Sequence, residues 1–183
     1  MPPSFRVTRD TPALYLTSVT KDRLPVFRTS AIAAIACRSL VEASKSGKFL
    51  IFAYALMPDH LHVITDSSQN STDVLRFING IISRRVIDHL KENAHEESLE
   101  KLRIQKRPDG WQYSLWQHHP NTRLIWSERM LWQRIQYTHL NPVRLGLVDH
   151  PNEWRWSSSR IFSKRRSDDE PIEIDLDRIK WTY

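Results

Sequence analysis

The chain of 183 residues has a single cysteine, Cys37, and no long run of apolar residues. One cysteine excludes an internal disulfide framework and a zinc site built from several cysteines. No segment approaches the roughly 20 apolar residues that a membrane-spanning helix needs. The opening Met-Pro-Pro-Ser-Phe-Arg lacks the apolar core of a signal peptide. We therefore expect a cytoplasmic protein without a membrane partner, in which Cys37 is a small buried side chain.

The chain is basic. Its 27 lysines and arginines exceed its 21 aspartates and glutamates, which gives a formal net charge of +6 and a pI of about 9.7. This balance favours a polyanionic partner, with nucleic acid first. Contacts to phosphate groups are expected from Arg84, Arg85, Arg134 and Arg144. Basic side chains on a solvated surface with acidic neighbours would give the same pattern.

Length and composition fit one domain with a tail. Hydrophobic residues make up 40% of the chain and include seven tryptophans, which is enough for one core. Beyond Ser163 the run Lys-Arg-Arg-Ser-Asp-Asp-Glu-Pro is polar, and a short alternating segment, Ile172-Glu-Ile-Asp-Leu, follows it. We expect a domain over residues 1–162, then a polar linker and C-terminal tail over residues 163–183.

Periodicity and turn residues predict the order of the elements. Strands are expected at 13–20, 49–57, 60–65, 111–117 and 123–126, and helices at 29–47, 71–90 and 127–140. Residues 91–110 are charged and irregular, which is typical of a loop or an extended helix end. The second helix is expected to be capped by Ser71, Thr72 or Asp73. Pro142 cannot donate a helix hydrogen bond, so the third helix should end at Asn141.

This order predicts an α+β fold with a ferredoxin-like antiparallel sheet and helices packed on one face. The other face of the sheet would then be left to carry polar side chains. His60 and His62 lie two residues apart in a predicted strand, so both imidazoles share a face. Two neutral imidazoles can hold a divalent ion. Two half-buried histidines on a wet sheet face are the structural alternative.

A second segment, Gln136 to Val148, carries polar residues with helical spacing. Tyr137 and Asn141 are four residues apart, so they lie on one helical face and can offer a phenolic oxygen and an amide oxygen to one centre. His139 should point elsewhere on the helix. A tyrosine ring packed in a core and an asparagine that bonds the backbone at a helix end are the structural alternatives.

These segments resemble the HUH single-tyrosine transposases, most of all the REP-associated tyrosine transposases with their IS200-like transposase domain. The landmarks run in the family's order over roughly residues 13 to 160, and this ordered set is specific. They are Leu16 to Phe27, Met57 to His62, Leu115 to Gln117, Tyr137 to Val148, and Trp154 to Ser158. The chain departs from the family at Asp59, where Asn is frequent, and at Leu145, where a small residue is usual before Gly146; neither departure touches the assigned ligands.

The resemblance implies an HUH endonuclease type of fold and a metal-dependent tyrosine DNA transposase. Such an enzyme cleaves single-stranded DNA at hairpin-flanked sites through a 5′-phosphotyrosine intermediate and then transfers the strand. It implies Tyr137 as the nucleophile, His60 and His62 as metal ligands, and Asn141 as a third ligand or orienting group. The ion is expected to be Mg²⁺ or Mn²⁺, because two imidazoles and an amide oxygen leave positions for water and phosphate.

Two other functions fit the same residues. One is a metal-dependent phosphodiesterase that uses water as its nucleophile, and the other is a non-catalytic ferredoxin-like module that binds nucleic acid. The predicted catalytic helix has one tyrosine, which argues against a two-tyrosine relaxase cycle. The sequence allows a monomer with its active site in one chain, or a homodimer that exchanges the tyrosine helix.

Overall fold

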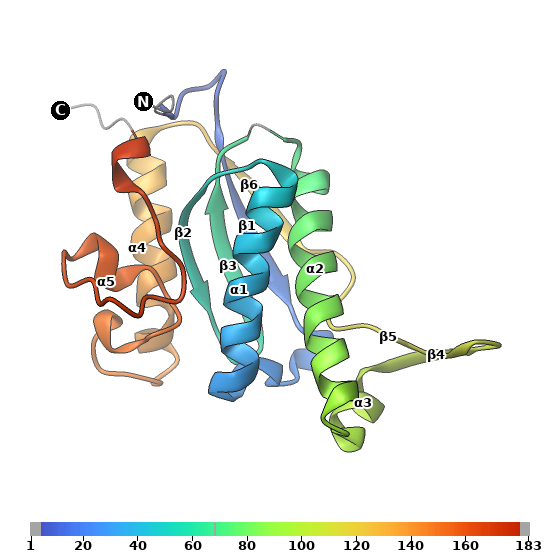
Figure 1. The fold of residues 1–183 in the computed structure, drawn as a ribbon. Helices are drawn as coiled ribbons and strands as arrows, with labels where there is room; N and C mark the ends of the chain where they lie inside the picture. Colours follow the sequence, from blue (N-terminus) through green and yellow to red (C-terminus); the bar gives the residue numbers. More distant parts are fainter. Residues whose placement is uncertain (1–4, 68, 180–183) are drawn as a thin grey trace.

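A four-stranded antiparallel sheet forms the centre of the protein (Figure 1). The structure is a computed structural model that describes residues 5–67 and 69–179. The strands lie in the order β2-β3-β1-β6, and each pairs with its neighbour in antiparallel direction. Their bounds are β1 Ala13–Val19, β2 Ile51–Leu56, β3 His60–Thr65 and β6 Asn121–Ile125. The predicted antiparallel sheet is therefore confirmed.

Helices α1 (Ser30–Gly47) and α2 (Ser71–Glu92) pack together against one face of this sheet (Figure 1). The larger core lies between them and the sheet, and Cys37 is buried in it. Burial raises the pKa of the Cys37 thiol to about 12, so it is a packed neutral side chain, as expected.

The third long helix, α4 (Glu128–Arg144), lies on the opposite face, so the helices do not all share one face. Leu131 and Ile135 of α4 pack on Ile64 and Ile125 in a second, smaller core. Successive side chains of a strand point to opposite faces of the sheet, and β1 has apolar side chains at both odd and even positions. Both faces of the sheet are therefore covered at β1. The face left open beside α4 is the part where polar side chains replace these apolar ones.

Helix caps follow the sequence with one difference. Thr29 and Ser127 cap α1 and α4 through their side chains. The cap of α2 is Asn70, whose side chain accepts a hydrogen bond from the backbone N–H of Asp73, and not one of the three residues after it. Asparagine is as good a cap as serine, and the helix simply begins one residue earlier.

Pro142 does not end α4, contrary to the prediction; the helix continues to Arg144. It closes with the N–H of Gly146 bonded to the carbonyl of Val143 and that of Leu147 bonded to the carbonyl of Pro142. Gly146 takes the left-handed conformation (φ 66°) that this C-terminal motif needs. Asn141 therefore lies inside the helix, and its side chain is directed by helical geometry.

Residues 91–113 are folded, which the irregular charge pattern did not indicate. They form α3 (Glu96–Leu102) and a two-stranded hairpin of β4 (Arg103–Arg107) and β5 (Gly110–Tyr113). The predicted strand at 111–117 is thus divided: β5 pairs with β4, while Trp116 makes a single bridge to Thr20 beside the main sheet. Figure 1 shows the hairpin projecting from the body, and we call residues 103–113 the β4–β5 arm.

The C-terminal segment up to residue 179 packs on the body of the protein. It contains short helical turns and four buried isoleucines; Ile161, Ile172 and Ile174 join the larger core, and Ile179 joins the smaller one. The turns are η3 Pro151–Glu153, α5 Ser159–Phe162 and η4 Leu176–Arg178, and two further turns near the start are η1 Lys21–Arg23 and η2 Val26–Arg28. Across the described part of the chain, helices long and apolar enough to span a membrane are absent.

The ion pair between Arg160 and Glu170 holds this segment in place, and we expect it to contribute to the stability of the protein. The Glu170 side chain is 1% exposed and lies 3.0 Å from the Arg160 guanidinium. Glu170→Ala leaves Arg160, itself 19% exposed, without its partner, so the free energy of unfolding should fall by about 3 kcal/mol in urea denaturation. The matched variant is Glu173→Ala, because Glu173 pairs with Arg166 at an exposed position and should cost less than about 1 kcal/mol. Equal losses in the two variants would contradict this assignment.

Candidate active site

A pocket of about 480 Å³ opens on the sheet face that carries α4. Side chains from β1, β3, β6 and α4 line it, together with three residues of the adjoining turns. They are Tyr15, Thr17, Val19, Arg23, Asp59, His60, His62, Asn121, Arg123, Arg134, Tyr137, Asn141 and Leu145. The four residues predicted to form one centre, His60, His62, Tyr137 and Asn141, are all among them.

His62 is fixed from three sides. Its Nδ1 lies 2.9 Å from the hydroxyls of both Tyr15 and Thr17, and the amide nitrogen of Asn141 donates to its Nε2 at 2.8 Å. With Nε2 accepting, the ring proton lies on Nδ1 and is shared with the two hydroxyls. Burial, and then the nearby His60, lower the pKa of His62 to about 3, so the imidazole is neutral.

His60 is held through the same ring atom by a carboxylate. Its Nδ1 is 2.5 Å from Asp59 Oδ1, and Arg23 donates to the other oxygen of Asp59 at 3.0 Å. Burial acts to raise the pKa of Asp59, but the hydrogen bonds and charges of His60 and Arg23 outweigh it and lower that pKa. Asp59, which the sequence comparison set aside as a departure without effect on the ligands, thus contacts one of them.

The two rings fit a divalent ion better than the residue types alone indicate. Their centroids are 4.8 Å apart, and each ring is bonded through Nδ1, which leaves Nε2 with the lone pair that a metal ligand needs. Among the described residues, clusters of three or more His, Cys, Asp and Glu side chains suited to a metal are absent. A third protein ligand would therefore be an amide, and Asn141 at the Nε2 edge of His62 offers its oxygen after rotation of the amide.

Tyr137 lies at the open side of the pocket. Its side chain is 37% exposed, and its ring is 5.9 Å from that of His62 and 6.5 Å from that of Tyr15. The guanidinium of Arg144 lies 4.7 Å above the Tyr137 ring. Two turns of α4 therefore place a solvent-accessible phenol, a cation and the Asn141 amide beside the histidine pair.

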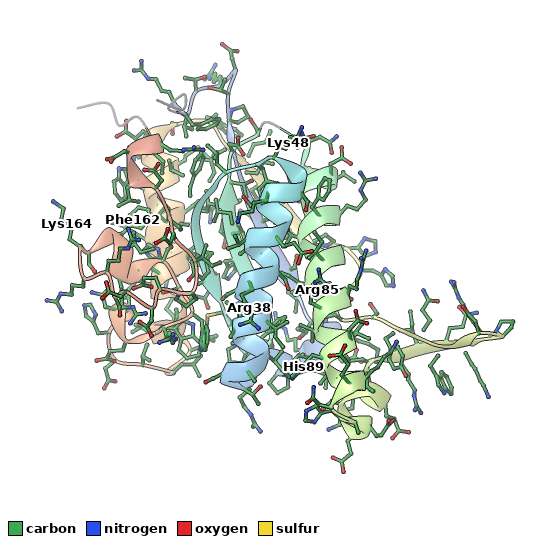
Figure 2. The ribbon with its side chains drawn as sticks, viewed as in Figure 1. Arg38, Lys48, Arg85, His89, Phe162 and Lys164 are labelled. Atoms are coloured by element: carbon green, nitrogen blue, oxygen red, sulfur yellow. The ribbon has the colours of Figure 1, made fainter. Side chains whose placement is uncertain are left out.

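The four arginines proposed for DNA contacts divide into two groups. Arg134 lines the pocket, with its guanidinium 5.4 Å above the Tyr15 ring, and Arg144 is beside Tyr137. Arg84 and Arg85 lie on α2, on the far side of the sheet, where Arg85 pairs with Glu42 of α1. Figure 2 shows Arg85 on that helical face with Arg38 and His89 nearby.

His139 stays out of the pocket, as its position on the helix predicts. It is buried, and its Nε2 lies 2.8 Å from the Ser158 hydroxyl, with Phe162 against its ring. Burial lowers the pKa of His139 to about 4. Its role in the structure is to pack the second half of α4 onto the C-terminal segment.

Several residues of the site are absent from the sequence interpretation. Tyr15 and Thr17 orient His62, and Arg23 orients Asp59. Tyr15 and Thr17 alternate with the apolar Leu14 and Leu16, so the sequence shows that they share a face. Their contact with His62 depends on the register of β1 against β3, which pairs Thr17 with His62 and which no local pattern gives.

Comparison with known proteins relates the chain to a family of transposases. The family model "Transposase IS200 like" matches residues 13–119, more than half of the chain. A putative REP-associated tyrosine transposase of Haemophilus influenzae is 25% identical over 114 residues, which are 60% of this chain and 58% of that protein. The match therefore spans less than two thirds of the length of this curated relative.

One solved structure shows the same fold, and a second is less similar. The structure of a REP-associated tyrosine transposase bound to a REP hairpin has a TM-score of 0.61 at 15% identity, over 93% of this chain and 89% of the other. A putative transposase from Deinococcus radiodurans gives a TM-score of 0.48 at 20% identity, over 69% and 88% of the two chains.

The hydrogen bonds of the histidine pair predict their tautomers. In protein without metal, ¹⁵N NMR should find a proton on Nδ1 of both His60 and His62, because Asp59 and the two hydroxyls bond there. Asp59→Ala should change the tautomer of His60 and leave that of His62. The exposed His118 is the internal control. A proton on Nε2 of His62 would contradict the arrangement and would mean that Asn141 presents its oxygen to that atom.

Proposed function

Because the chain belongs to the IS200-like transposase family, we propose that it is a single-stranded DNA endonuclease and strand transferase acting through a tyrosine. In this proposal it cleaves DNA beside a hairpin, forms a 5′-phosphotyrosine intermediate and transfers the strand. The observation that carries the proposal is the meeting of Tyr137 and Asn141 from α4 with His60 and His62 from β3 in one open pocket.

The pocket is proposed to hold Mg²⁺ or Mn²⁺ through His60, His62 and Asn141. The chemistry that such an ion supplies when bound is polarisation of a phosphate oxygen and stabilisation of charge on the oxygen that leaves. Imidazoles suit Mn²⁺ better than Mg²⁺, which prefers oxygen ligands. Tyr15, Thr17 and Asp59 serve this site by fixing the two rings through Nδ1.

Tyr137 is the proposed nucleophile. Its oxygen forms a bond to phosphorus while the bond from phosphorus to the 3′ oxygen breaks; the phenolic proton is lost, and the released 3′ oxygen is protonated. A neutral phenol is a weak nucleophile, so positive charge near the oxygen that attacks assists the step. Arg144 above the Tyr137 ring supplies such a charge. The energy of the broken phosphodiester bond is kept in the phosphotyrosine adduct. The 3′ hydroxyl of another strand can then attack the phosphorus, which joins the strands and releases Tyr137.

Phosphate contacts in this proposal come from the arginines at the pocket. Arg134 and Arg144 flank Tyr137, and Arg23 and Arg123 also line the pocket. Arg84 and Arg85, on the other face of the sheet, would serve only DNA that passes around the protein, and Arg85 is already paired with Glu42. We therefore propose that the phosphate groups at the cleavage site contact Arg23, Arg123, Arg134 and Arg144.

The proposed substrate is single-stranded DNA with a hairpin, as in the relative whose structure contains a REP hairpin. The proposed working unit is a monomer or a homodimer. Tyr137 meets His62 within one chain here, and a homodimer that exchanges α4 would bring the same residues together from two chains.

The decisive test is formation of the protein–DNA adduct. Purified protein, labelled hairpin DNA from the repeats around its gene and Mn²⁺ or Mg²⁺ should give a labelled protein band on a denaturing gel. Tyr137→Phe should abolish the band, because no phenolic oxygen remains, while binding of the DNA stays within a few-fold. The matched variant is Tyr54→Phe, which removes a phenol from the core outside the pocket and should keep the band.

Other results of this experiment identify the rival functions. Cleavage without a labelled protein in either variant would indicate a phosphodiesterase that uses water. Binding without cleavage across all repeat sequences would indicate a non-catalytic nucleic-acid-binding module. Either result would remove Tyr137 as the nucleophile.

The metal assignment has its own prediction. Titration of Mn²⁺ followed by electron paramagnetic resonance should show one site, lost in His60→Ala. Asp59→Ala should lower the affinity for Mn²⁺ by about 10–100-fold, because the imidazole of His60 is then no longer held in one orientation. His118→Ala is the control, since His118 is an exposed histidine outside the pocket. Unchanged affinity in His60→Ala would reject the site.

A further inference from the structure

The β4–β5 arm, residues 103–113, has a composition that the fold does not explain. Trp111 is 43% exposed and Ile104 is 47% exposed at positions where a hairpin that serves only as a connection would carry polar residues. The arm contacts the body chiefly at its base, and Figure 2 shows its side chains extending on both sides of the ribbon. A single exposed tryptophan needs no ligand, but here Trp111 stands on a projecting hairpin beside other aromatic and charged side chains.

One face of the arm combines aromatic rings with positive charge. Cross-strand pairing places Lys106 opposite Trp111 and Arg103 opposite Tyr113, so these four side chains share a face. Arg103 and Lys106 lie 4.8 Å and 5.9 Å from the centre of the Trp111 ring. Lys91, from the end of α2, lies 5.1 Å from the centre of the Tyr113 ring. Two rings with three cations form a continuous row.

The charge of the arm is positive and mostly free. Arg103, Lys106 and Arg107 face one acidic residue within the arm, Asp109. Arg103 has a distant ion pair with Glu100 at 3.9 Å; within the described ranges, Lys106 and Arg107 take part in no ion pair. Exposed cations beside exposed rings match a ligand that has both phosphate groups and accessible base faces.

The base of the arm is tied to the edge of the pocket. Trp116 bridges Thr20, the N–H of Lys21 bonds to the carbonyl of Leu115, and the N–H of Gln117 bonds to the carbonyl of Val19. Val19 and Arg23 line the pocket, so the arm leaves the protein beside the proposed cleavage site. The five residues of β4 extend about 16 Å from there.

We infer that the face formed by Lys91, Arg103, Lys106, Trp111 and Tyr113 binds single-stranded DNA next to the segment being cleaved. The inference rests on the proposed function for the identity of the nucleic acid. Single-stranded DNA is favoured over duplex because stacking on Trp111 needs an unpaired base, and a duplex hides its base faces. The arm would hold the flanking strand by stacking and by phosphate contacts without reading its sequence.

The test measures binding in the full chain without metal. Fluorescein-labelled (dT)24 and a blunt DNA hairpin of equal length are titrated in EDTA by fluorescence anisotropy. Trp111→Ala should lower the affinity for (dT)24 by about tenfold, the range that loss of one stacked base gives, and leave the affinity for the hairpin unchanged. The matched variant is Trp126→Ala, with a tryptophan that is 48% exposed outside the arm and should keep affinity for (dT)24.

The charges have a separate signature. The double variant Lys106→Ala with Arg107→Ala should lower the slope of log affinity against log salt by about 1.4 for (dT)24, as expected when two phosphate contacts are lost. Its control is Lys164→Ala with Arg165→Ala, two adjacent exposed cations far from the arm (Figure 2). Circular dichroism confirms that each variant is folded.

Three results would overturn the inference: unchanged (dT)24 affinity in Trp111→Ala, an equal loss in Trp126→Ala, or a loss for the blunt hairpin alone. The adduct assay separates this failure from failure of the proposed function. With DNA in excess, Trp111→Ala should still form the adduct, and Tyr137→Phe should bind (dT)24 normally. Loss of (dT)24 binding in the arm variants of a protein that forms no adduct would keep the inference and reject the proposed function.

Discussion

The pairing of β1 with β3 is the contact on which the site depends. Its register places Thr17 opposite His62 and brings the Tyr15 hydroxyl to the same ring nitrogen. A slip by one residue would send His60 and His62 to the opposite face, into the core under α1 and α2. The apolar residues that alternate with them, Leu61 and Val63, are buried there and hold the register by their own packing. The histidine pair is therefore positioned by hydrophobic burial on the other side of its strand.

The second constraint is the orientation of each imidazole. Both rings are bonded through Nδ1, one to a carboxylate and one to two hydroxyls, although the partners come from different elements. This common arrangement leaves Nε2 of each ring free of these bonds, and a metal ligand also has to be a neutral imidazole. Burial supplies that condition for His62, whose pKa is lowered to about 3. Packing and hydrogen bonding thus orient the two imidazoles in the way that binding of a metal ion requires.

Much of this arrangement follows from the sequence, and the exceptions have physical causes. The first three strands, α1 and the residues Tyr137 and Asn141 on one helical face are visible in local periodicity, because each buries a regular stripe. Of the β4–β5 arm only part of β5 is visible, since β4 buries no face and so has no apolar period. Pro142 misleads because the last turn of α4 is closed by Gly146 beyond it. Arg23 and Tyr15 join the site through contacts with Asp59 and His62 on distant segments, which a single sequence does not encode locally.

The placement of Tyr137 on α4 has a mechanical consequence. In the proposed reaction a DNA strand is joined to this helix, so any tension on the strand is transmitted as a load along α4. The helix resists it through Leu131 and Ile135 in the smaller core and through His139 against Ser158. These anchors lie on both sides of Tyr137 in the sequence of the helix, and a load at its exposed side is shared between them. The buried face of α4 thus keeps the DNA end that is bound to Tyr137 beside the histidine pair until the second strand binds.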